Sequence, residues 1–209
     1  MATPGFPLPL RNALAALVLA AHEDDAAVTA LAWLVASAGE PPPAAAAHLV
    51  ALHLIDAGGR TLLPVHAVHA AAVAAHAARA LSAARAYRQG PAEEASRAVR
   101  RAAALWNEHL FFEVHEVLEA VWLTAIGDER QALQGVIQIA VAFHHLAHGN
   151  LRGGRSLMAE GRARLASVPP AVLGVLDVPA LLSATAPWEA ALAAAADPPA
   201  EPPRLALRA

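Results

Sequence analysis

Alanine makes up about 28% of this 209-residue chain, and this composition limits the fold more than any other feature. Ala is the best helix former, and its small side chain lets helices pack closely although each one buries little area. Apolar residues recur at helical spacing along most of the chain, and strand-like pieces occur only near residue 60. The sequence therefore predicts an all-α protein with at most a small β-hairpin.

Turn and break signals first mark off residues 1–64. Three short helices are predicted there, at about 10–22, 25–37 and 42–55. Two short apolar pieces around Gly58–Gly59 follow them and favour a hairpin. Three helices and a small hairpin follow each other in this order in winged-helix proteins, so we expect a winged-helix-like module.

The remaining chain divides into three parts. A long Ala-rich helix over 65–90 is expected to link the first module to the rest. Its end is set by Gly90–Pro91, a strong turn signal. Residues 91–196 show helical spacing throughout and predict a helical bundle. The Pro-rich residues 197–209 are expected to form a disordered tail.

Charge and cysteine content exclude several classes of protein. The formal net charge is −3, which disfavours attraction of the whole molecule to nucleic acid or to an anionic membrane. The chain has no Cys, so disulfides, thiolate catalysis and Cys-ligated metals are excluded. The apolar run over 13–21 is too short to span a bilayer, and no secretory signal is visible. We expect a cytoplasmic protein without membrane contact.

Acidic, imidazole and aromatic side chains crowd into one predicted helix, between Leu105 and Trp122. Positions i and i+4 share a helix face, so His115 and Glu119 lie together. Phe112 precedes His115 by three positions, and Trp122 follows Glu119 by three. This face therefore presents a polar pair between two aromatic rings.

The next predicted helix, over about 129–148, is apolar but carries Gln134, Gln138 and His145 near one side. Polar groups on such a helix are costly when they are unpaired. Their natural partners are His115 and Glu119 of the preceding helix. We expect His115, Glu119, Gln138 and His145 to form one buried or half-buried cluster.

Three segments carry a resemblance to a known family: WNEHLFFEVHEVLEAVW, LQGVIQIAVAFHHL and HGNLRGG. Over about residues 97–185 the chain resembles the domain-of-unknown-function family numbered 309. The family hallmark H-x-x-x-E-x-x-[WY] is matched by His115, Glu119 and Trp122, whereas His144 and Trp106 depart from the family's usual residues. The resemblance implies a helical bundle without an established activity, for which metal binding through the His/Glu motif has been suggested.

Two interpretations of the cluster remain open. His115, Glu119 and His145 could ligate one divalent ion, and imidazole with carboxylate suits zinc, manganese or iron. Alternatively, the cluster is a hydrogen-bond network that fixes helix register, or a pocket for a small polar ligand. The pocket would include further polar and aromatic residues: Asn107, Phe112, Glu116, Trp122, Gln134, Gln138 and Asn150. No motif of a hydrolase, P-loop or dinucleotide-binding protein occurs, so no catalytic residue is assigned.

A DNA-associated regulator is a second class of function that the winged-helix order suggests. The candidate recognition helix, from Pro41 to His53, lacks the Arg, Asn and Gln that read bases, and only Arg60 is well placed for a phosphate. DNA binding is therefore disfavoured.

A structural or dimerising protein without catalysis is the third class. Large apolar side chains are more numerous than two small modules need, and exposed apolar patches mark partner surfaces. These residues are Leu31, Trp33, Leu34 and Phe111. On this basis we expect a homodimer.

Overall fold

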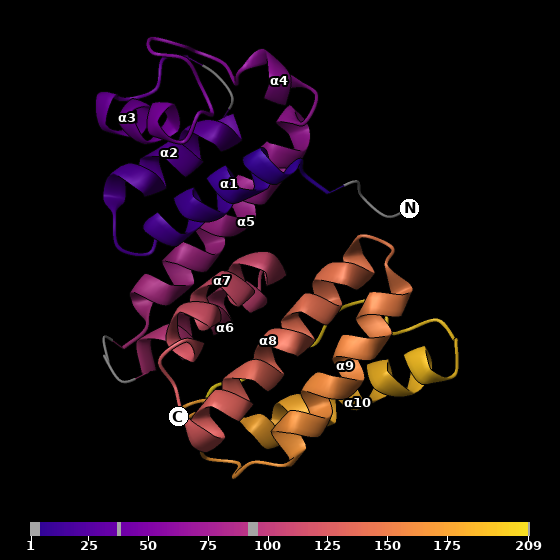
Figure 1. Ribbon diagram of the computed structural model, residues 1–209. Helices are drawn as coiled ribbons and strands as arrows, with labels where there is room; N and C mark the ends of the chain where they lie inside the picture. Colours follow the sequence, from indigo (N-terminus) through magenta and orange to yellow (C-terminus); the bar gives the residue numbers. More distant parts are fainter. Residues whose placement is uncertain (1–4, 37–38, 92–95, 209) are drawn as a thin grey trace. The chain divides into compact units, whose positions relative to one another are not determined.

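The structure is a computed structural model that describes residues 5–36, 39–91 and 96–208. Its described residues form helices and no strand, which confirms the all-α prediction (Figure 1). The chain divides into two compact units, an N-terminal unit over Gly5–Pro91 and a C-terminal unit whose described residues are 96–208. No helix in the described parts is long and apolar enough to cross a membrane.

The N-terminal unit contains α1 (Leu8–Ala20), α2 (Asp25–Ala36), α3 (Pro43–Ala51), α4 (Pro64–Ala67) and α5 (Ala70–Gln89). Helix α5 packs against α1 and α2, and its buried face consists largely of Ala77, Ala80, Ala83 and Ala84. Methyl groups let the helices approach closely. The single linking helix that we expected over 65–90 is divided into α4 and α5 in the structure. The longer piece, α5, belongs to the core of this unit.

The expected hairpin after α3 is a loop in the structure. One backbone hydrogen bond, from Leu63 N to Leu54 O at 2.9 Å, closes it, and Gly59 N donates to Asp56 O at 2.8 Å in its turn. A Cβ at Gly59 would lie 2.9 Å from that same Asp56 oxygen, so the turn requires glycine. A single closing bond gives no strand ladder, and the winged-helix resemblance is not confirmed.

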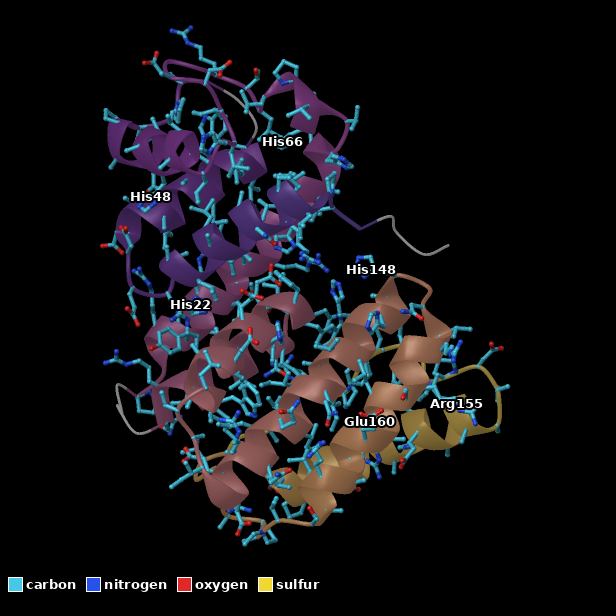
Figure 2. All side chains as sticks on the ribbon, in the orientation of Figure 1. His22, His48, His66, His148, Arg155 and Glu160 are labelled. Carbon is cyan, nitrogen blue, oxygen red and sulfur yellow. The ribbon has the colours of Figure 1, made fainter. Side chains whose placement is uncertain are left out.

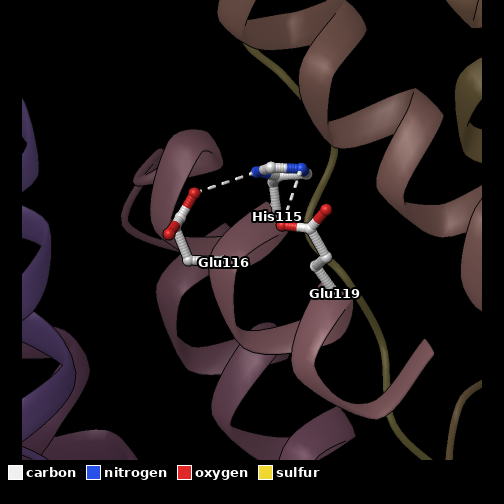
Figure 3. A group of neighbouring side chains, drawn as sticks. All are labelled: His115, Glu116 and Glu119. Atoms are coloured by element: carbon white, nitrogen blue, oxygen red, sulfur yellow. Dashed lines mark hydrogen bonds and ion pairs between the residues drawn. The ribbon is translucent and has the colours of Figure 1, made fainter. Parts of the chain in front are cut away.

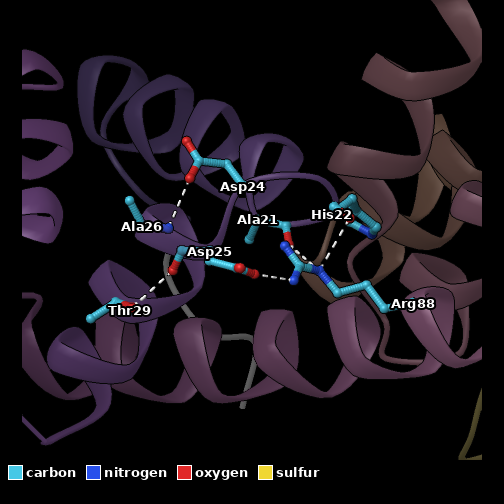
Figure 4. A network of polar contacts seen from close by, with 7 residues as sticks. All are labelled: Ala21, His22, Asp24, Asp25, Ala26, Thr29 and Arg88. Carbon is cyan, nitrogen blue, oxygen red and sulfur yellow. Dashed lines mark hydrogen bonds and ion pairs between the residues drawn. The ribbon is translucent and has the colours of Figure 1, made fainter.

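Polar contacts fix the start of α2 (Figure 4). The carboxylate of Asp24 accepts from Ala26 N at 2.8 Å and thereby caps the helix. It also lies 2.8 Å from His48 Nε2 on α3. Both contacts favour the ionised carboxylate, so the bond from Ala26 first, and that from His48 second, lower the pKa of Asp24.

Arg88 ties the end of α5 to the turn between α1 and α2 (Figure 4). Its Nε donates to Ala21 O and His22 O, both at 3.2 Å, and its guanidinium pairs with Asp25. The Arg88 cation complements the dipole at the carbonyl end of α1, and the Asp25 carboxylate complements the dipole at the N-terminal end of α2.

The lowered pKa of Asp24 predicts a pH dependence of stability. The folded state holds this proton less tightly than the unfolded state, so the stabilisation is complete above the ordinary Asp pKa and is lost as the pH falls through the lowered value. We expect the difference in unfolding free energy between the wild type and Asp24→Asn to shrink as the pH falls from about 5 to about 2. Denaturant titrations measure it. The exposed Asp197→Asn control should show no such trend, and a difference independent of pH would contradict the assignment.

The C-terminal unit contains α6 (Arg97–Trp106), α7 (Phe111–Trp122), α8 (Gly127–Ala147), α9 (Leu151–Ala166) and α10 (Val178–Ala193). Trp106, Phe111, Phe143 and Trp188 form its aromatic centre. The ring centroids of Trp106 and Phe143 are 5.5 Å apart, and those of Phe143 and Trp188 are 4.9 Å apart with an edge-to-face geometry. Residues from α6, α7, α8 and α10 thus share one core.

Helices α8 and α9 run side by side (Figure 1) and make the most extensive helix contact in the described residues. Two glycines face each other where they touch. A Cβ at Gly161 would lie 2.7 Å from Gly135 O, and a Cβ at Gly135 would lie 2.9 Å from Gly161 O. Only hydrogen atoms fit between these two backbones.

The described part of the C-terminal segment is docked, in contrast to the disordered tail expected over 197–209. Trp106 Nε1 donates to Pro203 O at 2.7 Å. The side chain of Asn107 accepts from Leu205 N at 2.8 Å and donates to Leu205 O at 3.3 Å. Leu207 forms an antiparallel bridge with Leu176, and Leu205 is 3% exposed. Backbone pairing and one buried Leu offset the conformational entropy that a Pro-rich segment loses when it becomes ordered. Composition alone does not reveal these contacts.

The apolar residues that suggested a dimer are buried within the chain. Leu31, Trp33, Leu34 and Phe111 are 0%, 7%, 2% and 4% exposed. The homodimer remains a prediction, and it loses this support.

Replacement of Gly161 by Ala tests the contact between α8 and α9. Ala is favoured over Gly inside a helix by about 1 kcal/mol, but the new methyl must push two backbones apart, which costs about 1–3 kcal/mol. We expect Gly161→Ala to lower the free energy of unfolding in spite of its higher helix propensity. Arg155→Ala, an exposed substitution on the same helix, is the control and should unfold like the wild type. Stabilisation by Gly161→Ala would contradict the close approach.

Removal of the Leu205 side chain tests the docked segment. We expect Leu205→Ala to lower the unfolding free energy by about 2–3 kcal/mol. The loss cannot exceed the free energy with which the segment docks, because the segment can detach from the rest of the unit. Thermal and urea unfolding measure the change. The exposed neighbour variant Arg204→Ala should unfold like the wild type, and equal stability of all three proteins would show that the segment contributes nothing.

Candidate metal centre

One turn of α7 brings three potential metal ligands together: His115, Glu116 and Glu119. One ligand atom from each lies within 4.8 Å of the other two, which makes them the only such group of three found in the described residues. Figure 3 shows the two carboxylates on opposite sides of the imidazole ring. Glu116 Oε1 is 3.2 Å from His115 Nδ1, and Glu119 Oε2 is 3.6 Å from His115 Nε2.

The group is half-exposed rather than buried. The side chains of His115, Glu116 and Glu119 are 27%, 37% and 47% exposed. Water reaches the two carboxylates and screens their charges. The C-terminal unit therefore tolerates both acids at these positions without a bound ion. The group could hold a metal ion.

Gln138 does not join this group, contrary to the expected cluster. It is 7% exposed, and both ends of its amide are bound by α9. Its Nε2 donates to Glu160 Oε2 at 3.0 Å, and its Oε1 accepts from Arg164 Nε at 3.0 Å. Gln138 lies beside Gly161, whose Cβ would be only 3.0 Å from the Gln138 Cβ, so the close helix pair directs the amide toward α9. Figure 2 places Glu160 on that helix.

A polar line on α9 completes this network. Glu160 accepts from Ser156 Oγ at 2.8 Å, and Arg164 also donates to Gln131 Oε1 at 2.7 Å. Ser156, Glu160 and Arg164 recur at intervals of four, which is a sequence signal that could have revealed this face. Neither Glu160 nor Arg164 was among the expected site residues.

His145 is also not in the group, and its contacts show a structural role. Asn150 caps α9, because its Oδ1 accepts from Gly153 N at 2.9 Å. That bond fixes the amide orientation, so Nδ2 donates to His145 Nδ1 at 3.1 Å. His145 Nδ1 is therefore an acceptor and the proton is on Nε2. Ligation of a metal through Nε2 would displace that proton and break the contact with Asn150.

The segment HGNLRGG is a tight turn between α8 and α9. Gly149 has φ 77°, Asn150 N donates to His145 O at 2.9 Å, and Gly149 N donates to Leu146 O at 3.0 Å. These two bonds define a Schellman motif, which ends a helix with a left-handed residue. Asn150 then begins the next helix, and Gly154 lets that helix approach Ala142 and Leu146. The conspicuous residues of this segment thus build a turn.

Trp122 lies at the end of α7, and the side chain of Arg130 covers its ring. Arg130 was not among the residues predicted for the site. The Arg130 guanidinium carbon is 3.8 Å from the centre of the indole ring. Arg130 Nη1 donates to Trp122 O at 2.8 Å and to Ala125 O at 3.3 Å. Arg130 thereby caps the carbonyl end of α7. The buried Trp122 Nε1 has no hydrogen-bond partner among the described residues.

The other expected pocket residues are dispersed. Asn107 binds the backbone of Leu205. Phe112 lies between His115 and His144, with ring centroids 6.1 Å and 5.9 Å away. Gln134 is half-buried on α8. Of the expected metal ligands, only His115 and Glu119 are brought together, and Glu116 from the expected pocket joins them.

Comparisons with known proteins agree with the resemblance. Residues 99–157, from α6 into α9, match the family described as Domain of unknown function (DUF309). An uncharacterized protein of Aquifex aeolicus (strain VF5) is 28% identical over 78 residues, which are 37% of this chain and 23% of that protein. The chain thus spans less than a quarter of that relative's length. No solved structure matches the chain.

Substitution of Arg130 tests its contact with Trp122. We expect Arg130→Met to lower the unfolding free energy by about 1–2 kcal/mol, since it removes the cation over the ring and the donor at the helix end while keeping an apolar stem. Arg130→Lys keeps the charge but lacks the planar fork, so it should recover only part of the loss. Thermal unfolding of the three proteins measures this order, and full stability of Arg130→Met would contradict the role.

Proposed function

We propose that the chain binds one divalent transition-metal ion through His115, Glu116 and Glu119. The observation that supports this is the mutual proximity of the three ligand atoms on one helical turn. In tetrahedral sites with metal–ligand bonds of about 2.0–2.2 Å, neighbouring ligand atoms are about 3.4 Å apart. The 3.6 Å between His115 Nε2 and Glu119 Oε2 is close to that separation, so this pair needs little adjustment to share an ion.

Glu116 must move to complete the site. It faces Nδ1, whereas Glu119 faces Nε2, and one ion takes only one ring nitrogen. The Glu116 side chain is 37% exposed, so a rotation of its carboxylate costs little. His115 and Glu119 are therefore the primary ligands, and Glu116 is the third.

The donor set favours particular ions. One imidazole and two carboxylates suit zinc, manganese or iron, while magnesium and calcium prefer oxygen ligands alone. Three protein ligands leave at least one position for water or for a small ligand. Such an open position also accommodates the alternative of a small polar ligand, which would bind through the ion.

A purely structural role for the group is the competing interpretation. Half-exposed ion pairs contribute about 0–1 kcal/mol, so His115→Ala should scarcely change the melting temperature of the metal-free protein. A DNA-associated function gains no support from the described residues, because α3, the candidate recognition helix, carries no Arg, Asn or Gln side chain that could read a base.

Calorimetric titration of tag-free, chelator-treated protein with Zn²⁺ and Mn²⁺ tests the proposal. We expect one ion per chain, with binding lost in His115→Ala and weakened about tenfold or more in Glu119→Gln, since a ligand lost from so small a set is not replaced. Element analysis of protein purified without a tag identifies the ion that is carried.

The matched control is His148→Ala. His148 lies at the end of α8 (Figure 2), and its ring centroid is 4.3 Å from that of His144, so this pair could capture zinc by itself. Binding should be unchanged in His148→Ala. Binding that disappears in His148→Ala but persists in His115→Ala would overturn the proposed site.

A further inference from the structure

A cavity of about 480 Å³ lies within the N-terminal unit, and none of the residues of the metal proposal lines it. Its lining comes from α2, from the loop before α4, and from α4 and α5. The lining residues are Trp33, Leu34, Arg60, Thr61, Leu62, Pro64, Ala67 and Ala70. Volumes of about 300–1,000 Å³ with a mostly apolar lining are typical of small-molecule sites.

The cavity has a fixed inner wall. Trp33 and Leu34 are 7% and 2% exposed, so α2 holds them in the core of the unit. The indole is further anchored, because Trp33 Nε1 donates to Gly39 O at 3.1 Å. An immobilised indole and a Leu side chain provide a flat apolar surface that loses little entropy when a ligand covers it.

The opposite wall is made by small side chains. Ala67 ends α4 and Ala70 begins α5, and each contributes only a methyl group to the lining. No longer side chain from these helices fills the space. The lining is partly open to water, so an apolar ligand that covers these methyl groups would remove apolar surface from water, which is favourable.

Arg60 is the only charged residue of the lining. Its guanidinium pairs with Glu40 at 2.9 Å, and both side chains are 70% exposed. Such exposed pairs are weak, so a ligand anion can replace the Glu40 carboxylate with little loss. Thr61 lies next to it in the lining and offers a hydroxyl to the same anion.

We infer that this cavity binds a small amphipathic monocarboxylate, with its apolar body against Trp33 and Leu34 and its carboxylate at Arg60. The volume accommodates a single medium-length chain or a compact ring system. The single cation selects one anionic group. Guanidinium and carboxylate form a two-bond pair, which orients the ligand with its head toward the loop.

Titration of the full chain with decanoate tests this site, with decanol as the uncharged analogue. We expect one decanoate per cavity and weaker binding of decanol. Arg60→Gln should weaken decanoate binding about three- to tenfold and leave decanol binding unchanged. Glu40→Gln should strengthen decanoate binding by a comparable factor, because the competing carboxylate is gone.

Ala70→Leu separates the cavity from the remaining surface. Its longer side chain enters the space, so it should abolish binding of both ligands while the helix content and the melting temperature are retained or raised. Ala159→Leu, an exposed helical substitution in the other unit, is the matched control and should bind as the wild type does. If Ala70→Leu does not fold, the opposite responses of Arg60→Gln and Glu40→Gln still decide the question.

Three results would overturn the inference. They are equal affinity for decanoate and decanol, unchanged decanoate affinity in both charge variants, and absence of decanoate binding to the folded chain. Titration with phosphatidylglycerol vesicles distinguishes a free carboxylate from a membrane lipid. The cavity is sized for one chain, so Ala70→Leu should also abolish any binding that uses the cavity. Vesicle binding that survives Ala70→Leu would assign the binding to the protein surface instead of the cavity.

Discussion

The contact between Gly135 and Gly161 determines how the C-terminal unit is arranged. Because a Cβ at either position would lie within 3 Å of the opposite backbone oxygen, α8 and α9 approach as closely as two helices can. This closeness brings the polar line of α9 against α8, and the buried Gln138 is satisfied there by Glu160 and Arg164. A larger residue at position 135 or 161 would separate the helices and leave that amide unpaired in an apolar setting, which is costly.

The same arrangement leaves His115 outside the core network. Gln138 already has two partners on α9, and His145 is held by Asn150 in the turn between the helices. The polar face of α7 therefore retains only its own acids, Glu116 and Glu119. Polar residues that serve a core are fully paired and dry, whereas these three are part-exposed and can rearrange. That difference is the physical basis for distinguishing a binding group from a packing network.

Sequence periodicity predicted the helices and the pairing of His115 with Glu119, because both follow from spacing along one helix. Periodicity identifies which residues share a face, but it does not say which helix that face meets, and so Gln138 was assigned to the wrong neighbour. The docked segment around Leu205 was missed for a related reason: its partners Trp106 and Asn107 lie about a hundred residues away, and no local pattern carries that information.

Alanine content has opposite consequences in different parts of the N-terminal unit. Between α5 and its neighbours it produces a tight interface, because aligned helices bring methyl groups into contact at Ala77, Ala80 and Ala84. Where the chain breaks between α4 and α5, Ala67 and Ala70 each contribute only a methyl group to the wall opposite Trp33. A Leu-rich sequence would fill such a gap through rotamer changes, but an Ala side chain has no rotamer to change. The composition that lets the helices pack closely thus also leaves this cavity unfilled.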